Sequence, residues 1–110
     1  MAKIDALALA AQIISRPSVT PDEAGAFEPL RSLLEPRGFV SEVDRTPNGT
    51  SNLWCRRGAE PPLFVFAGHV DVVPPGEASL WSTPPFEPQV RDGAFYGRGS
   101  SDMKTSDACF

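Results

Sequence analysis

The sequence is poor in the residues that build several common kinds of site. Its 110 residues include one histidine, His69, and two cysteines, Cys55 and Cys109. The cysteines stand alone, without another Cys or His at the spacing of a structural zinc site, so free thiols are the expected state. Any metal site in this chain must therefore be built on one imidazole and on carboxylates.

The charge and hydropathy of the chain exclude two classes of partner. The formal net charge is −4, from 14 acidic and 10 basic residues, which argues against nucleic acid because phosphate binding requires a basic face. No stretch approaches the ~20 apolar residues of a membrane span, so we expect no membrane partner. The first ten residues, MAKIDALALA, lack the pattern of a secretory leader, and we expect a cytoplasmic protein.

Helical patterns occupy the first third of the chain. Apolar residues spaced by three, four and three predict a first helix that ends before Pro17; its stripe is Ile4, Leu7, Ala11 and Ile14. A second helix is predicted to start at Thr20, which can cap it, with Glu23 completing a capping box and Gly38 at its end. Its predicted stripe is Ala24, Phe27, Leu30 and Leu34, with a kink at Pro29.

The apolar period then changes to that of strands. Residues 39–43 and 51–57 read as strands, and the unbroken apolar run at 62–68 predicts a central strand covered on both faces. Asp92-Gly93 predicts a hairpin turn, and a helix is expected after residue 102. The expected fold class is α/β, with a central mixed β-sheet flanked by helices.

His69 and Asp71 follow the apolar run, at the edge where open α/β sheets bind ligands. Residues two apart in a strand share a face, so the two side chains should lie together. Such a pair serves as a general base held by an acid, or as a metal ligand oriented by a carboxylate. A structural histidine bonded to its neighbour is the third alternative. Asp102, after a glycine-containing turn, supplies a second acid.

A longer motif resembles a known family. Residues 68–104, GHVDVVPPGEASLWSTPPFEPQVRDGAFYGRGSSDMK, are similar to the signature of the co-catalytic zinc aminoacylase and carboxypeptidase family. The resemblance implies two zinc ions per full-length subunit, with cobalt as a possible substitute. It implies His69 as a ligand of one zinc, Asp102 as the ligand bridging both, and Asp71 as the catalytic carboxylate that orients His69.

The resemblance also implies what residues 1–110 do not hold. They would be the N-terminal part of the dizinc catalytic domain, with the general-base Glu, further acidic ligands and a last His beyond Phe110. We expect the full-length protein to be a homodimer and these 110 residues to be inactive alone. Asp107 departs from expectation, because a helix packed on a sheet requires an apolar residue there.

The implied substrate is a small N-acyl amino acid. Residues 16–25, RPSVTPDEAG, and 51–54, SNLW, resemble the branch of the family that hydrolyses N-succinyl-LL-2,6-diaminopimelate to succinate and LL-2,6-diaminopimelate, in lysine and cell-wall synthesis. An acetylornithine deacetylase or a small-peptide carboxypeptidase of the same family is the alternative. A non-catalytic truncated chain is the alternative from another class.

Overall fold

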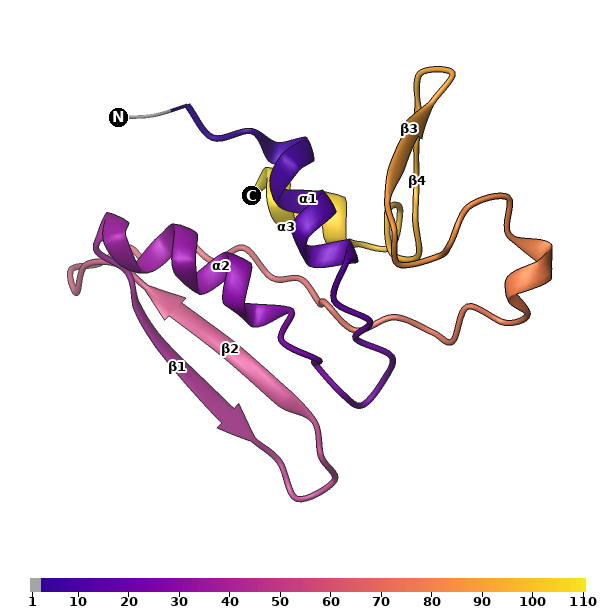
Figure 1. Cartoon of the computed structure of the whole chain (residues 1–110). Helices are drawn as coiled ribbons and strands as arrows, with labels where there is room; N and C mark the ends of the chain where they lie inside the picture. The colour runs from indigo at the N-terminus through magenta and orange to yellow at the C-terminus, as the bar shows by residue number, and fades with distance from the viewer. Residues whose placement is uncertain (1–2) are drawn as a thin grey trace.

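The computed structural model describes residues 3–110 and combines short helices with two small sheets (Figure 1). The helices are α1 (Ala6–Ile14), α2 (Phe27–Leu34) and α3 (Lys104–Cys109), with short 3-10 turns η1 (Glu35–Arg37) and η2 (Ala78–Leu80). The strands are β1 (Val40–Arg45), β2 (Ser51–Arg56), β3 (Gln89–Arg91) and β4 (Ala94–Tyr96). No helix within residues 3–110 has the length and hydropathy to cross a membrane.

Helix α1 confirms the first predicted helix and the burial of Ile14, but the rest of its buried face differs from the prediction. Asp5 caps it, because its carboxylate accepts hydrogen bonds from the backbone N–H groups of Leu7 and Ala8 at 3.0 and 3.1 Å. The buried residues are Leu9, Ala10, Ile13 and Ile14. Ile4 and Leu7 of the predicted stripe are 44% and 45% exposed. Apolar residues occur on more than one side of this helix. The face that is buried is therefore set by the position of α3, which packs against it.

Helix α2 begins seven residues after the predicted start. Thr20 does not cap it; its N-cap is Ala26, and no side chain caps it there. Pro29 therefore falls in the first turn, where its missing N–H removes no helical hydrogen bond, and the predicted kink has no cause. Gly38 closes η1 with a φ of +88°, as predicted for the end of this helical region.

The strands form two separate antiparallel pairs. β1 pairs with β2, in a register that places Val40 opposite Arg56. β3 pairs with β4 across the turn at Asp92 and Gly93, whose φ angles of 50° and 79° suit a tight hairpin. The described residues combine helices and strands, as the predicted α/β class requires, but they hold two sheets of two strands in place of the predicted central mixed sheet.

Residues 62–68 lie between these pairs without forming a strand. The region is extended in Figure 1, and no strand among the described residues hydrogen-bonds to it. Phe64 is 79% and Phe66 59% exposed, so the prediction of a strand covered on both faces is also wrong here. The Phe66 ring stacks on Phe110 at 5.0 Å between centroids. An apolar run becomes a central strand only where partner strands and covering layers exist.

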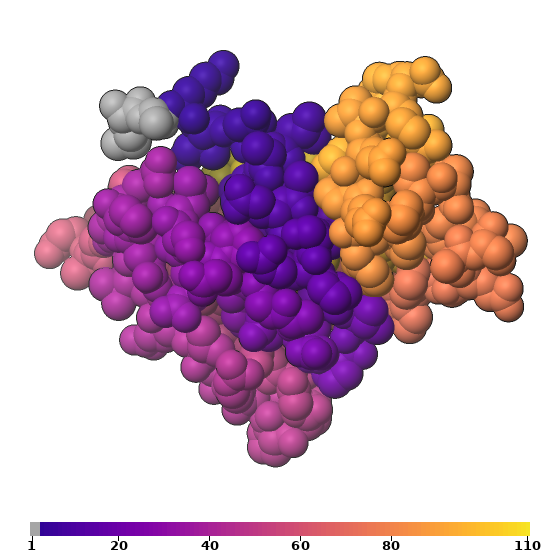
Figure 2. All heavy atoms as spheres, in the orientation of Figure 1, coloured from indigo at the N-terminus to yellow at the C-terminus, as the bar shows by residue number. Residues whose placement is uncertain are grey.

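The core lies between α1, α2, α3 and the segment after residue 68. It contains Leu9, Ala10, Ile13, Ala26, Phe27, Val70 and Ala108. In the space-filling view, α1 and the residues after it fill the centre, between the α2–β1–β2 unit and the β3–β4 hairpin (Figure 2). Lys104, fully buried, donates to the carbonyl oxygens of Ile13 and Arg16 at 3.1 and 2.9 Å. This side chain satisfies carbonyls at the end of α1 and joins α3 to it.

We predict that Gly99→Ala destabilises the fold more than Gly93→Ala. Both glycines have positive φ angles, +88° and +79°, so alanine is strained at either position by about 1–2 kcal/mol. A Cβ at Gly99 would also lie 2.9 Å from Cγ1 of Val72 and 3.0 Å from Cδ of Lys104, whereas nothing lies within 4 Å at Gly93. We expect a further loss of about 1–3 kcal/mol from overpacking at Gly99.

Urea unfolding of the two variants of the full-length protein measures the difference in their free energies of unfolding. Equal losses in the two variants would show that the contacts around Gly99 are loose.

Candidate metal centre

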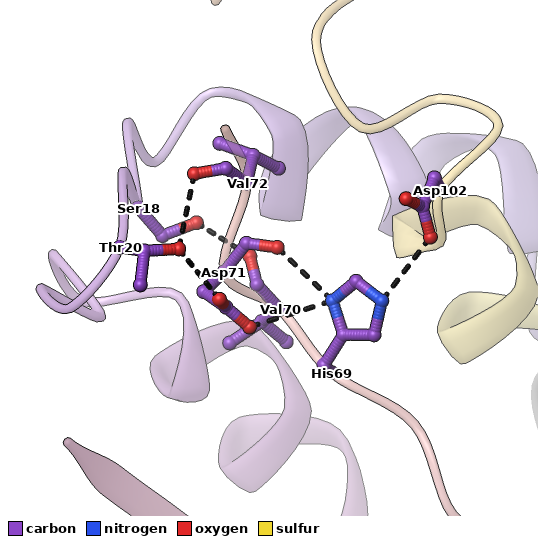
Figure 3. A network of polar contacts seen from close by, with 7 residues as sticks. All are labelled: Ser18, Thr20, His69, Val70, Asp71, Val72 and Asp102. Atoms are coloured by element: carbon purple, nitrogen blue, oxygen red, sulfur yellow. Dashed lines mark hydrogen bonds and ion pairs between the residues drawn. The ribbon is translucent and has the colours of Figure 1, made fainter. Parts of the chain in front are cut away.

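The candidate site rests on a short pairing between two distant segments (Figure 3). Val19 and Val72 form a parallel β-bridge. The Thr20 N–H donates to the Val72 carbonyl at 3.0 Å, and the Val72 N–H donates to the Ser18 carbonyl at 2.9 Å. Ser18 is fully buried, and its hydroxyl donates to the Val70 carbonyl at 2.6 Å. These three hydrogen bonds fix the backbone that follows His69.

The structure brings the three predicted site residues together. His69 Nδ1 lies 3.0 Å from the backbone carbonyl of Asp71 and 3.4 Å from its Oδ1. On the other side of the ring, His69 Nε2 lies 3.1 Å from Oδ1 of Asp102 (Figure 3). Asp71 thus meets the imidazole through its carbonyl more closely than through the carboxylate that the sequence points to.

This arrangement suits a proton or a metal ion at Nε2. A carbonyl oxygen only accepts, so Nδ1 must carry the proton, and Nε2 then points a lone pair at the Asp102 carboxylate. A proton on Nε2, or a metal ion shared with Asp102, removes that repulsion. The His69 and Asp102 side chains are 45% and 87% exposed, so a ligand can reach both.

The surroundings of His69 favour its protonated form. Burial by itself would lower the pKa of His69. The hydrogen bond to the Asp71 carbonyl and the negative charges of Asp71 and Asp102 outweigh burial and raise this pKa above its ordinary value. The same negative potential attracts a metal ion, so a proton and a metal compete for Nε2.

The pair fits a zinc ion in donor chemistry, because zinc binds imidazole nitrogen and carboxylate oxygen. The 3.1 Å between Nε2 and Oδ1 is the length of an ordinary hydrogen bond, so the two groups already face one another. Residues 3–110 hold no group of three or more potential ligands, so this part of the chain supplies two donors of the usual four.

Asp107 lies beside the site although its position in the sequence predicts an apolar residue. A Cβ at Gly68 would lie 2.0 Å from its Oδ1, so the carboxylate packs against the backbone before His69. Its Oδ2 is buried and has no hydrogen-bond partner among residues 3–110. Burial raises the pKa of Asp107 to about 6, although the charges of His69 and Lys104 oppose the shift.

Two further residues of the site had no signal in the sequence. Ser18 and Thr20 reach the His69 segment from about 50 positions earlier in the chain, and Thr20 has the local pattern of a helix cap. Only the pairing of residues 18–20 with 70–72 reveals their role. A groove of about 700 Å³, lined partly by β2, α2 and residues 62–66, leads to His69.

Comparison with known proteins confirms the resemblance seen in the sequence. Residues 65–110 match the family described as Peptidase family M20/M25/M40. The chain is 55% identical over 105 residues to a succinyl-diaminopimelate desuccinylase of Azoarcus sp. (strain BH72). The aligned region covers 94% of this chain and 27% of that protein. The chain is also 54% identical over 101 residues to one of Dechloromonas aromatica (strain RCB), covering 91% and 26% respectively. The chain thus spans about a quarter of the length of these relatives.

We predict that Asp107→Asn stabilises the protein at neutral pH and not in acid. The folded-state pKa of about 6 lies above the ordinary value of 3.8, so the folded state binds more protons between these values. The protonated carboxyl therefore makes its full contribution to the free energy of unfolding below about pH 4, and this contribution is lost as the pH rises through 6. Asparagine does not titrate, and we expect it to gain on the order of 1 kcal/mol at pH 7.5.

Urea unfolding at pH 4.5 and 7.5 tests this prediction in the protein that carries the sequence. The matched control is Asp44→Asn, because Asp44 lies exposed on β1. An Asp107→Asn advantage that is the same at both pH values would contradict it.

Proposed function

We propose that this chain, residues 65–110 of which match the family described as Peptidase family M20/M25/M40, carries part of the metal site of a zinc-dependent amide hydrolase. The approach of His69 Nε2 to Asp102 Oδ1, at 3.1 Å, carries the proposal. These residues lie 33 positions apart, and both stand in the motif that matches the family. An imidazole and a carboxylate that face one another at a site open to solvent suit the binding of a metal ion better than a structural role.

The proposed cofactor is a pair of Zn²⁺ ions, which Co²⁺ could replace. His69 would hold one ion through Nε2, and Asp102 would bridge both, one oxygen to each. Bound zinc lowers the pKa of a water ligand and polarises an amide carbonyl. The two donors supplied here leave the remaining ligands and the general base to other parts of a longer protein, so residues 1–110 alone should be inactive.

Each residue of the candidate site has a defined task in this proposal. His69 presents the Nε2 lone pair, and Asp71 keeps the proton on Nδ1 through its carbonyl and carboxylate oxygens. The pairing of residues 18–20 with 70–72 keeps this segment in place. Asp102 presents a carboxylate that is 87% exposed and is therefore accessible to more than one metal ion.

The proposed substrate is N-succinyl-LL-2,6-diaminopimelate, because the relatives that match 91–94% of this chain are named succinyl-diaminopimelate desuccinylases. Water would cleave the amide C–N bond: its hydroxyl joins the succinyl carbonyl carbon and its proton joins the nitrogen, releasing succinate and LL-2,6-diaminopimelate. The proposal includes a homodimeric full-length protein. It also includes a cytoplasmic location, which the free thiols of Cys55 and Cys109 support.

We predict that His69→Ala removes most activity and much of the bound zinc while the fold is retained. The His69 side chain is 45% exposed and outside the core, so its loss leaves no cavity. Loss of a ligand should cost more than the 10–100-fold typical of a group that only supports a ligand. The assay is hydrolysis of succinylated against acetylated substrate, with zinc content by elemental analysis.

The control for His69→Ala is Glu42→Gln, a substitution at an exposed position on β1. Normal turnover and normal zinc content in His69→Ala would refute the proposed metal centre. Faster hydrolysis of the acetylated substrate would keep the metal centre and overturn the choice of acyl group.

A further inference from the structure

We infer that Thr20 is a positioning residue of the metal centre. Its hydroxyl holds the carboxylate of Asp71, and through Asp71 it fixes the proton and the ring orientation of His69. This inference rests on the proposed function, because it concerns how the same imidazole is prepared for a metal ion. It assigns a role to a residue whose sequence pattern predicts only a helix cap.

The contact between Thr20 and Asp71 is short and charge-assisted. Thr20 Oγ1 lies 2.6 Å from Oδ2 of Asp71 and 3.3 Å from the carbonyl oxygen of Val72. A hydroxyl has one proton to donate, and the shorter distance and the negative charge direct it to the carboxylate. Thr20 is thus a hydrogen-bond donor to Asp71.

The position of this hydroxyl is set by the backbone on both sides. Thr20 donates its N–H to Val72, and two residues earlier the Ser18 carbonyl accepts from Val72. Ser18 is 0% exposed and bonds Val70 through its side chain. Thr20 therefore approaches Asp71 from a segment held by backbone hydrogen bonds, and its hydroxyl is directed at one carboxylate oxygen (Figure 3).

The hydrogen bond from Thr20 to Oδ2 determines where the other carboxylate oxygen of Asp71 lies. With Oδ2 bonded to Thr20, Oδ1 of Asp71 is left 3.4 Å from Nδ1 of His69, beside the carbonyl at 3.0 Å. Two oxygens then face Nδ1 and favour a proton there, which leaves the Nε2 lone pair for a metal ion. Without the Thr20 hydroxyl the carboxylate is free to rotate about χ2, and this preference weakens.

A purely structural role for the Thr20 hydroxyl predicts different behaviour. The Thr20 side chain is exposed, so valine at this position removes the hydroxyl without opening a cavity. Ser18 belongs to the same paired segment, is buried, and does not contact Asp71 in the described network. Thr20→Val should change His69 with little effect on stability, whereas Ser18→Ala should lower stability with little effect on the His69 tautomer.

The direct test is made in the full-length protein, where the His69 imidazole signals are assigned by their loss in His69→Ala. We would record ¹⁵N shifts of this imidazole at pH 8.5 in the zinc-free wild type, Thr20→Val, Thr20→Ser and Ser18→Ala. The wild type should show the Nδ1–H tautomer. Thr20→Val should shift the ring toward a mixture of tautomers, and Thr20→Ser, which keeps the hydroxyl, should restore the wild-type pattern.

Zinc titration of the protein that carries this sequence supplies a second readout. Thr20→Val should weaken zinc binding about tenfold, the lower end of the range for groups that support a ligand. In an Asp71→Ala background the same substitution should have no further effect, because Thr20 acts through Asp71. This comparison also separates the positioning role of Thr20 from a general loss of folding. A general loss of folding would lower zinc affinity further than Asp71→Ala alone.

Any of three results would overturn the inference. The first is that Thr20→Val changes neither the His69 tautomer nor the zinc affinity. The others are that Thr20→Ser fails to restore the wild-type tautomer, or that Ser18→Ala shifts the tautomer as much as Thr20→Val. A protein that neither binds zinc nor hydrolyses amides would refute the proposed function instead. In that case the tautomer measurement still decides whether Thr20 positions His69.

Discussion

The parallel contact of residues 18–20 with residues 70–72 is the constraint on which the rest of the structure depends. It joins the segment that leaves α1 to the segment that leaves His69, and both hydrogen bonds involve the backbone of Val72. Lys104 binds carbonyls at the end of the same helix, so α3 is tied to that region too. His69 and Asp102 are therefore positioned by one structural unit although they stand far apart in the sequence.

Elements defined by local chemistry could be predicted from the sequence. Asp92-Gly93 forms its hairpin because both residues adopt the positive φ angles that such a turn requires. Gly38 ends the second helical region for a similar reason. Residues 62–68 have an equally clear apolar pattern, but a strand also needs a partner, and none pairs with them in the described chain. For α1, the helix followed from local pattern, whereas the buried face depended on the position of α3.

The candidate site shows the same division. The types and spacing of His69, Asp71 and Asp102 identified them as candidates, and the structure places the three together. The Asp71 carbonyl, the nearest partner of Nδ1, could not be predicted because every residue has one. Thr20 could not be predicted because its pattern also suits a helix cap, and only a contact 51 residues away distinguishes the two roles. The sequence marks Asp107 as unusual, but it does not predict that its carboxylate packs against Gly68.

The long connection between Thr20 and Val72 has a consequence for the order of folding. The hydrogen bonds within each helix and hairpin are local and can form within microseconds, whereas this pairing must close a loop of about 50 residues. Residues of the site thus come together late, after the elements between them have shortened the effective loop. Because closure entropy grows only with the logarithm of loop length, a few residues inserted at the β1–β2 turn would cost the pairing only tenths of a kcal/mol. That turn is therefore a permissive position for a fluorescent or affinity tag that reports on assembly without disturbing it.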